Sequence, residues 1–161
     1  RPPLELSSAA SDVDKRQVHA GHAFSAPHRG YLDDTFLSVD MTSLSLAAGG
    51  TVNFGLRAGV GNAGRLYYLV PTFSGASPGT PLPGGGTFPI NLDAVSPLPF
   101  QSPTSVYFPG FFGFLDGQGD AAAAMVVPAI PGGSPITAHF AFALGFPFDF
   151  ATEARAVSIL P

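Results

Sequence analysis

The sequence predicts an all-β fold, an Ig-like or jelly-roll antiparallel β-sandwich with an extended N-terminal arm. Apolar and polar residues alternate over several short segments, which is the period of a strand with one buried face. Glycine and proline, 20 and 17 of the 161 residues, separate these segments as turns do. No apolar stripe of helical period has a useful length. Together these features favour seven or eight short strands in two sheets.

The composition supports a packed core in this fold. Hydrophobic residues make up 45% of the chain and include 15 phenylalanines, so the chain has apolar surface to bury and is not disordered. Charged residues make up only 11%, against about 25% in typical globular proteins. The length suits one domain with an appended segment. We place the arm at residues 1–35 and the sandwich at residues 36–161.

The first half of the sandwich should contain three strands. Residues 36–46 predict the first strand. Residues 52–57 alternate strictly and place their apolar side chains on one face. Residues 66–70 are nearly all apolar, which predicts a central strand covered on both faces. A loop rich in proline, glycine and serine follows at residues 71–89.

The second half of the sandwich should contain four more strands. Residues 111–115 and 121–127 predict strands, and Asp116–Asp120 between them predicts a hairpin turn. Residues 136–144 show the clearest alternation, with His139 on the outward face. The last strand, residues 154–160, should turn Val157 and Ile159 inward and Arg155 and Ser158 outward.

The arm carries most of the charge. Residues 1–40 hold ten of the 18 charged side chains, 7 basic and 11 acidic in the whole chain. Short alternating apolar patterns interrupt this charge, at Leu4 and Leu6 and again from Val18 to Phe24. An extended segment of this kind can add itself as a strand to the open sheet edge of a neighbour. We therefore expect Leu4, Leu6, Val18 and Phe24 to form a subunit interface.

Two groups of residues raise the question of a metal. His19, His22 and His28 have a spacing that could bind one ion, but free side chains on a polar arm are the simpler explanation. The segment Asp116–Asp120 is too short for an EF-hand loop and is better explained as a turn, and Asp93 lies far from it in sequence. We assign no metal and no cofactor.

The sequence does not favour an enzyme. His139 is the only histidine outside the arm, and no Gly-x-Ser-x-Gly elbow accompanies it. Asp149 and Glu153 lie close in sequence, but nothing indicates the cleft of a glycosidase. The spacing of Gly59, Gly61 and Gly64 matches a dinucleotide fingerprint only by letter, because a strand and not a helix follows it.

Charge and hydropathy also limit the partners. The net charge is −4 without a basic stripe, which argues against nucleic acid. No segment is long and apolar enough to cross a bilayer as a helix. A sugar-binding face could form from clustered aromatic residues, although packing in the core is the simpler explanation. These residues are Tyr67, Tyr68, Tyr107, Phe108, Phe111 and Phe112.

The order of several short motifs resembles a known module. Residues 44–50 lead to Gly64-Arg65-Leu66-Tyr67-Tyr68-Leu69, and Pro89-Ile90-Asn91-Leu92-Asp93 follows the loop. Phe114-Leu115-Asp116-Gly117-Gln118-Gly119 and the terminal residues 156–161 complete the pattern. It resembles the β-sandwich module at the C-terminal ends of secreted bacterial proteins of planctomycete type, over about residues 41–161. The resemblance implies export and an extracytoplasmic module, and it carries over no catalytic residue.

We therefore expect a non-enzymatic extracellular structural subunit that assembles with copies of itself into a filament, a pilus-like fibre or a surface layer. The chain starts at Arg1 without a methionine, which suggests an exported protein whose leader has been removed, or else an excised piece. Two alternatives are a secreted carbohydrate- or cell-surface-binding module and an accessory domain of a larger secreted enzyme.

Overall fold

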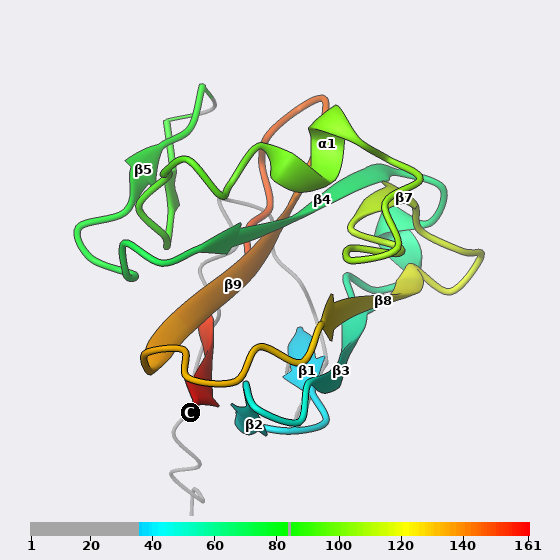
Figure 1. Ribbon diagram of the computed structural model, residues 1–161. Coiled ribbons are helices and arrows are strands. Elements are labelled where there is room, and N and C mark those ends of the chain that lie inside the picture. Colours follow the sequence, from blue (N-terminus) through cyan, green and yellow to red (C-terminus); the bar gives the residue numbers. More distant parts are fainter. Residues whose placement is uncertain (1–35, 84) are drawn as a thin grey trace, which may run out of the picture.

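The computed structural model describes residues 36–83 and 85–161, and this part of the chain is nearly all β (Figure 1). The leading segment, residues 1–35, which includes Leu4, Leu6, Val18, Phe24 and the histidines His19, His22 and His28, lies outside the described residues. The strands are β1 (Leu37–Val39), β2 (Ser43–Ser45), β3 (Gly50–Arg57), β4 (Leu66–Thr72), β5 (Thr80–Pro81), β6 (Thr87–Phe88), β7 (Phe112–Phe114), β8 (Asp120–Val127), β9 (Ile136–Leu144) and β10 (Arg155–Leu160).

Two sheets form the sandwich. One has three strands in the order β1-β3-β8, and the other has five in the order β2-β10-β9-β4-β7. Taken in chain order, these sheets correspond to strands A-B-E and G-F-C of the immunoglobulin sandwich, with β2 added beside β10 and β7 added beside β4. The structure therefore agrees with the predicted all-β class, and its strand order is that of the Ig-like alternative. All pairs but one are antiparallel, since β2 runs parallel to β10.

The predicted single strand at residues 36–46 is wrong in one respect. It is divided into β1, which pairs with β3, and β2, which pairs with β10 in the other sheet. The chain changes sheet after Asp40, whose carboxylate accepts hydrogen bonds from the side-chain amide and the backbone N–H of Asn53, at 2.6 and 2.9 Å. These bonds, led by the one from the Asn53 side chain, lower the pKa of Asp40.

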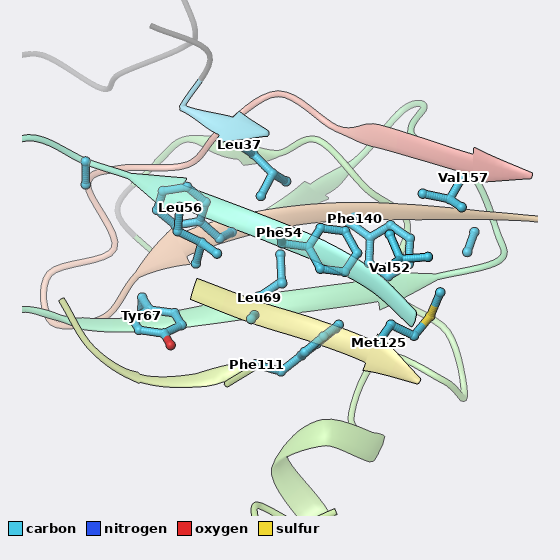
Figure 2. Close-up of a cluster of buried hydrophobic side chains, with 14 of the residues drawn as sticks. Leu37, Val52, Phe54, Leu56, Tyr67, Leu69, Phe111, Met125, Phe140 and Val157 are labelled. Atoms are coloured by element: carbon cyan, nitrogen blue, oxygen red, sulfur yellow. The ribbon is translucent and has the colours of Figure 1, made fainter. Parts of the chain in front are cut away.

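The main core lies between the two sheets. Figure 2 shows the rings of Phe54 from β3 and Phe140 from β9 meeting there, with a centroid distance of 4.7 Å. Phe111 packs edge-on against Phe54 at 5.7 Å. All three rings are fully buried. The alternation that the sequence shows in residues 52–57 places Val52, Phe54 and Leu56 in this core, as predicted.

The central strands β4 and β9 are covered on both faces. Leu69 and Phe142 face the main core, whereas Val70 and Ala141 face a second cluster on the outer side of the five-stranded sheet. Phe88 and Ile90 complete this second cluster, and they come from the loop that follows β4. Residues 66–70 form the predicted central strand, and Leu69 and Val70 are buried on its two faces, whereas Leu66 and Tyr68 are half-buried.

Two predictions about the second half need correction. The segment Asp116–Asp120 forms a tight turn, in which Gly119 has a φ of 80° and lies directly against the carbonyl of Gly59. It is not a hairpin, because β7 and β8 belong to different sheets. Arg155 does not point outward into solvent: its Nε donates to the carbonyl of Leu37 at 3.0 Å and so ties β10 to β1.

Short elements occupy the connections. The loop after β4 contains the two-residue strands β5 and β6, so residues 71–89 are not all loop. A four-residue helix α1 (Leu98–Gln101) and a 3-10 turn η1 (Val60–Asn62) also occur, although the sequence predicts no helix. Among the described residues, no helix is long and apolar enough to cross a membrane.

The packing of Phe140 generates a prediction. Phe140→Ala should lower the free energy of unfolding by about 3–5 kcal/mol, because it opens a cavity between Phe54 and Phe111. Urea denaturation followed by circular dichroism measures the change. Leu92→Ala, at a side chain 53% exposed, is the control and should change stability by less than about 0.5 kcal/mol. Equal effects of the two substitutions would contradict this account of the core.

Candidate functional site: a free strand edge and two apolar surfaces

The four edge strands of the sandwich differ in how their outward main-chain groups are used. An open edge is a template for pairing with another chain, so native proteins usually cover or charge it. At β8 the segment before β7 covers the edge: Val126 and Ala124 donate to the carbonyls of Tyr107 and Pro109, at 2.9 and 2.8 Å. This edge is therefore already occupied by the chain itself.

The edges of β1 and β2 are partly closed as well. In β1 the outward carbonyl of Leu37 accepts the hydrogen bond from Arg155. In β2 the outward carbonyl of Ser45 accepts from the backbone N–H of Gly49 at 2.9 Å. Serine flanks Leu44 on both sides of this short strand, so its outward positions are polar.

The edge of β7 is open. Leu69 donates to Phe111, and Leu115 donates to Arg65, so the odd-numbered residues of this segment face β4. Phe112 and Phe114 therefore direct their N–H and C=O groups away from β4, and none of the described residues bonds to them. Their side chains are 41% and 71% exposed. β7 thus combines free main-chain groups with exposed phenyl rings and no charge.

An aromatic face continues from β7 over the outer side of the five-stranded sheet. Tyr68 lies at its centre, with ring centroids 5.3 Å from Phe112, 5.6 Å from Phe100 and 6.2 Å from Phe148. Phe146 extends the group, with its ring 5.5 Å from that of Phe148. We call these residues, with Phe114, the aromatic face.

A polar network holds one end of this face in place. Arg65 forms an ion pair with Asp149 and also donates to the carbonyl of Pro147 at 2.7 Å. A second guanidinium N–H of Arg65 donates to Asn62, whose own amide donates to the carbonyl of Ala58. Through these bonds the turn before β4 fixes the segment that carries Phe146 and Phe148.

An apolar groove lies at the other end of the sandwich. Its volume is about 310 Å³, and its surface is almost entirely apolar. Met125, Val127 and Ile159 on its wall are also members of the main core and are only 5–9% exposed, so the groove borders the core. The groove is lined by Leu46, Phe73, Tyr107, Phe108, Met125, Val126, Val127, Pro128, Ile136 and Ile159.

Asp93 organises the long loop after β4. Its carboxylate accepts backbone N–H groups from Phe73, Ser74 and Val95, at 2.8, 3.0 and 2.9 Å. Partial burial acts to raise the pKa of Asp93, but these amides and the hydroxyl groups of Thr72 and Ser74 outweigh it and hold the pKa well below its ordinary value of 3.8. The carboxylate therefore serves as a clamp for the loop.

The predicted candidates are scattered by the fold. Tyr67 and Phe111 lie in the core, whereas Tyr68 and Phe112 lie on the aromatic face and Tyr107 and Phe108 line the groove. Gly59 and Gly64, the first and last glycines of the Gly-x-Gly-x-x-Gly match, flank the 3-10 turn η1. His139 stands in β9 between Thr72 of β4 and Ala156 of β10. The interface residues Leu4, Leu6, Val18 and Phe24 are not among the described residues, so their role stays a prediction.

The acidic residues considered as metal ligands or catalytic groups do not come together in the fold. The carboxylate of Asp116 accepts the backbone N–H groups of Gln118 and Asp120 within its own turn, and these bonds, that from Asp120 first, lower its pKa. Asp149 pairs with Arg65, and Glu153 is exposed. Within residues 36–83 and 85–161, no three acidic, histidine or cysteine side chains gather as metal ligands would.

Two residues of the site escaped the sequence reasoning. Phe114 belongs to an apolar strand without any polar position, and that pattern alone does not separate an edge strand from a central one. Phe146 lies between Gly145 and Pro147, a setting typical of a turn, where an exposed phenyl ring is unusual. A large aromatic residue inside a turn signal is the feature that could have indicated it.

Comparison with known proteins adds little. No protein-family model and no curated sequence matches the chain. One solved structure that it resembles is the E. coli chaperone DraB, with 11% identity and a TM-score of 0.39. The match covers 78% of this chain and 54% of that one, so the chain spans about half its length. A similarity at this level supports no inference about function.

The Asp93 clamp generates a pH-dependent prediction. Because the pKa of Asp93 is lowered in the folded state, its charged form adds stability above pH 3.8, and this is lost as pH falls toward the lower folded value. Asp93→Asn should cost about 1–3 kcal/mol at pH 7, since it places an amide donor among backbone donors.

Urea titrations of both proteins at several pH values test this prediction. The difference between wild type and Asp93→Asn should shrink as pH falls below about 4. Glu153→Gln, which removes an exposed carboxylate outside the clamp, is the control and should change stability little. A difference that stays constant down to pH 2 would show that the carboxylate charge does not hold the loop.

Proposed function

We propose that this protein is a non-enzymatic extracellular structural subunit, in which the N-terminal arm of one copy adds as a strand to β7 of the next. The assembly is then a filament, a pilus-like fibre or a layer, because a contact between two different surfaces need not close into a ring. The resemblance to modules of secreted bacterial proteins supports the extracellular placement.

The open edge of β7 is the observation that carries the proposal. The other three edges are covered or partly closed by the chain itself, whereas the main-chain groups of Phe112 and Phe114 point outward without a partner among the described residues. β7 is only three residues long, but it contains no charged residue and no proline, which are two common means of preventing association at an edge. An added strand would satisfy these groups and cover both phenyl rings.

The sequence of the arm suits such a strand. Val18, Ala20, His22 and Phe24 alternate, so they would lie on one face of an extended segment. Added beside β7, that face would continue the aromatic face of Phe112 and Phe114. Main-chain hydrogen bonds supply affinity in this mode of binding, and the alternate side chains supply specificity. In the sequence, 35 residues precede Phe36, so the segment of residues 18–24 is joined to the sandwich by further chain.

A second candidate function is carbohydrate binding. The specific observation in its favour is that Phe112, which is exposed, and the half-buried Tyr68 and Phe148 form an aromatic group beside the polar pair of Arg65 and Asp149. Sugar rings stack on aromatic faces and bond to charged groups at the rim. Retention of the monomer on insoluble polysaccharide, lost in Phe112→Ala, is the result that would favour this function over assembly.

Removal of an outward backbone N–H of β7 by a proline substitution tests the assembly directly. Phe114→Pro removes a donor that bonds to no described residue, and proline is tolerated at such a position of an edge strand. We expect the variant to fold but to remain monomeric, as deletion of residues 1–30 should also do. Negative-stain electron microscopy and sedimentation velocity measure the assembly, and circular dichroism measures the fold.

A matched control separates the β7 edge from a general effect of proline. Ser43→Pro makes the same change at an outward position of β2, on the other edge of the same sheet, and should leave assembly intact. Compact monomers in wild type at every concentration would overturn the proposed function. Assembly that persists in the deletion variant would show that the arm takes no part in the assembly.

A further inference from the structure

Phe146 stands out on the described surface. Its side chain is 78% exposed, which is the largest exposed fraction among the large hydrophobic residues. Its backbone has a φ of 42°, in the left-handed region that bulky side chains rarely adopt. Strained backbone of this kind is often kept where a side chain has a function. Arg65, which bonds to the carbonyl of Pro147, helps to hold this segment in position.

The apolar groove has the complementary form. It is a recess of about 310 Å³ without charged residues in its lining, and its wall combines exposed apolar side chains such as Phe73 and Ile136 with the edge of the main core. A space of this size and composition suits one or two apolar side chains from outside. Filling it would remove apolar surface from water on both partners, at about 25 cal/mol per Å².

Phe146 and the groove cannot meet within one molecule. Ile136, the first residue of β9, lines the groove, whereas Phe146 follows Leu144, the last residue of the same strand. Eight residue steps of a β-strand separate the ends by roughly 27 Å. Figure 1 shows the connections before and after β9 at opposite ends of that strand.

We infer that Phe146 of one copy inserts into the apolar groove of a second copy. This inference rests on the proposed self-assembly and adds a second, heterologous contact to it. Every copy carries both features at opposite ends, so the contact repeats head to tail along the direction of the strands. A two-fold dimer that paired Phe146 with itself would leave the groove open, and the arm is already assigned to β7.

Cross-linking between single-cysteine variants tests the contact, because the natural chain contains no cysteine. Phe146→Cys and Ile136→Cys are made in separate full-length proteins and mixed under assembling conditions with a short bis-maleimide reagent. We expect cross-linked dimers that contain one copy of each variant. Each variant alone, and a mixture of Leu92→Cys with Ile136→Cys, should give only background.

Substitutions that preserve the fold give an independent measurement. Phe146→Asn removes the ring but keeps a residue that tolerates the left-handed region, so its melting temperature should not fall. Ile136→Glu places a charge at the rim of the groove, where the native side chain is 37% exposed. Each should raise the concentration needed for assembly by about tenfold or more, as loss of an aromatic anchor does. Leu92→Ala, at another exposed apolar side chain, should leave it unchanged.

The outcomes separate this contact from the proposed function. If wild type assembles, but Phe146→Cys does not cross-link to the groove while Val18→Cys or Phe24→Cys does, the arm occupies the groove and the inference is wrong, although self-assembly stands. If wild type does not assemble and no cross-link forms, both fail. A cross-link that survives deletion of residues 1–30 upholds the contact and removes the arm from the assembly.

Discussion

Apolar packing between the two sheets is the interaction on which the rest of the structure depends. Phe54 of β3 and Phe140 of β9 meet across the sandwich, and burial of each such side chain contributes about 1.5–3 kcal/mol relative to exposure. With charged residues at 11% of the chain, ion pairs have a minor part. The Ig-like order of strands places the apolar faces of β3, β8, β4 and β9 against one another in this core.

The scarce carboxylates act on loops and turns. Asp40 accepts hydrogen bonds from Asn53 where the chain changes sheet, Asp93 clamps the long loop after β4, and Asp116 closes the turn before β8. Because backbone amides bond to these three carboxylates, they stabilise the connections between strands. Arg65 and Asp149 do the same at the end of the sandwich that carries Phe146.

The surface of the sandwich is unusual for a protein that acts alone. The uncovered edge at β7 and the apolar groove both lack the charge that normally keeps sheets apart, and an aromatic face lies beside β7. The two proposed contacts would cover these surfaces with copies of the same chain. In that view the low charge, the edge strand and the strained Phe146 have one common explanation, which is burial in an assembly.

The pattern of residues by itself determined the all-β class, most strand positions and the central place of residues 66–70, because alternation and continuous apolar runs report directly on how many faces of a strand are buried. It could not determine that residues 36–46 divide between two sheets or that β7 and β8 do not pair, since pairing depends on partners distant in sequence. For the same reason, only the tertiary structure decided which edge stays open. It also decided that Tyr67 lies in the core whereas Tyr68 is half-buried on the outer side of the sheet, and that Phe146 and the groove lie at opposite ends of the molecule.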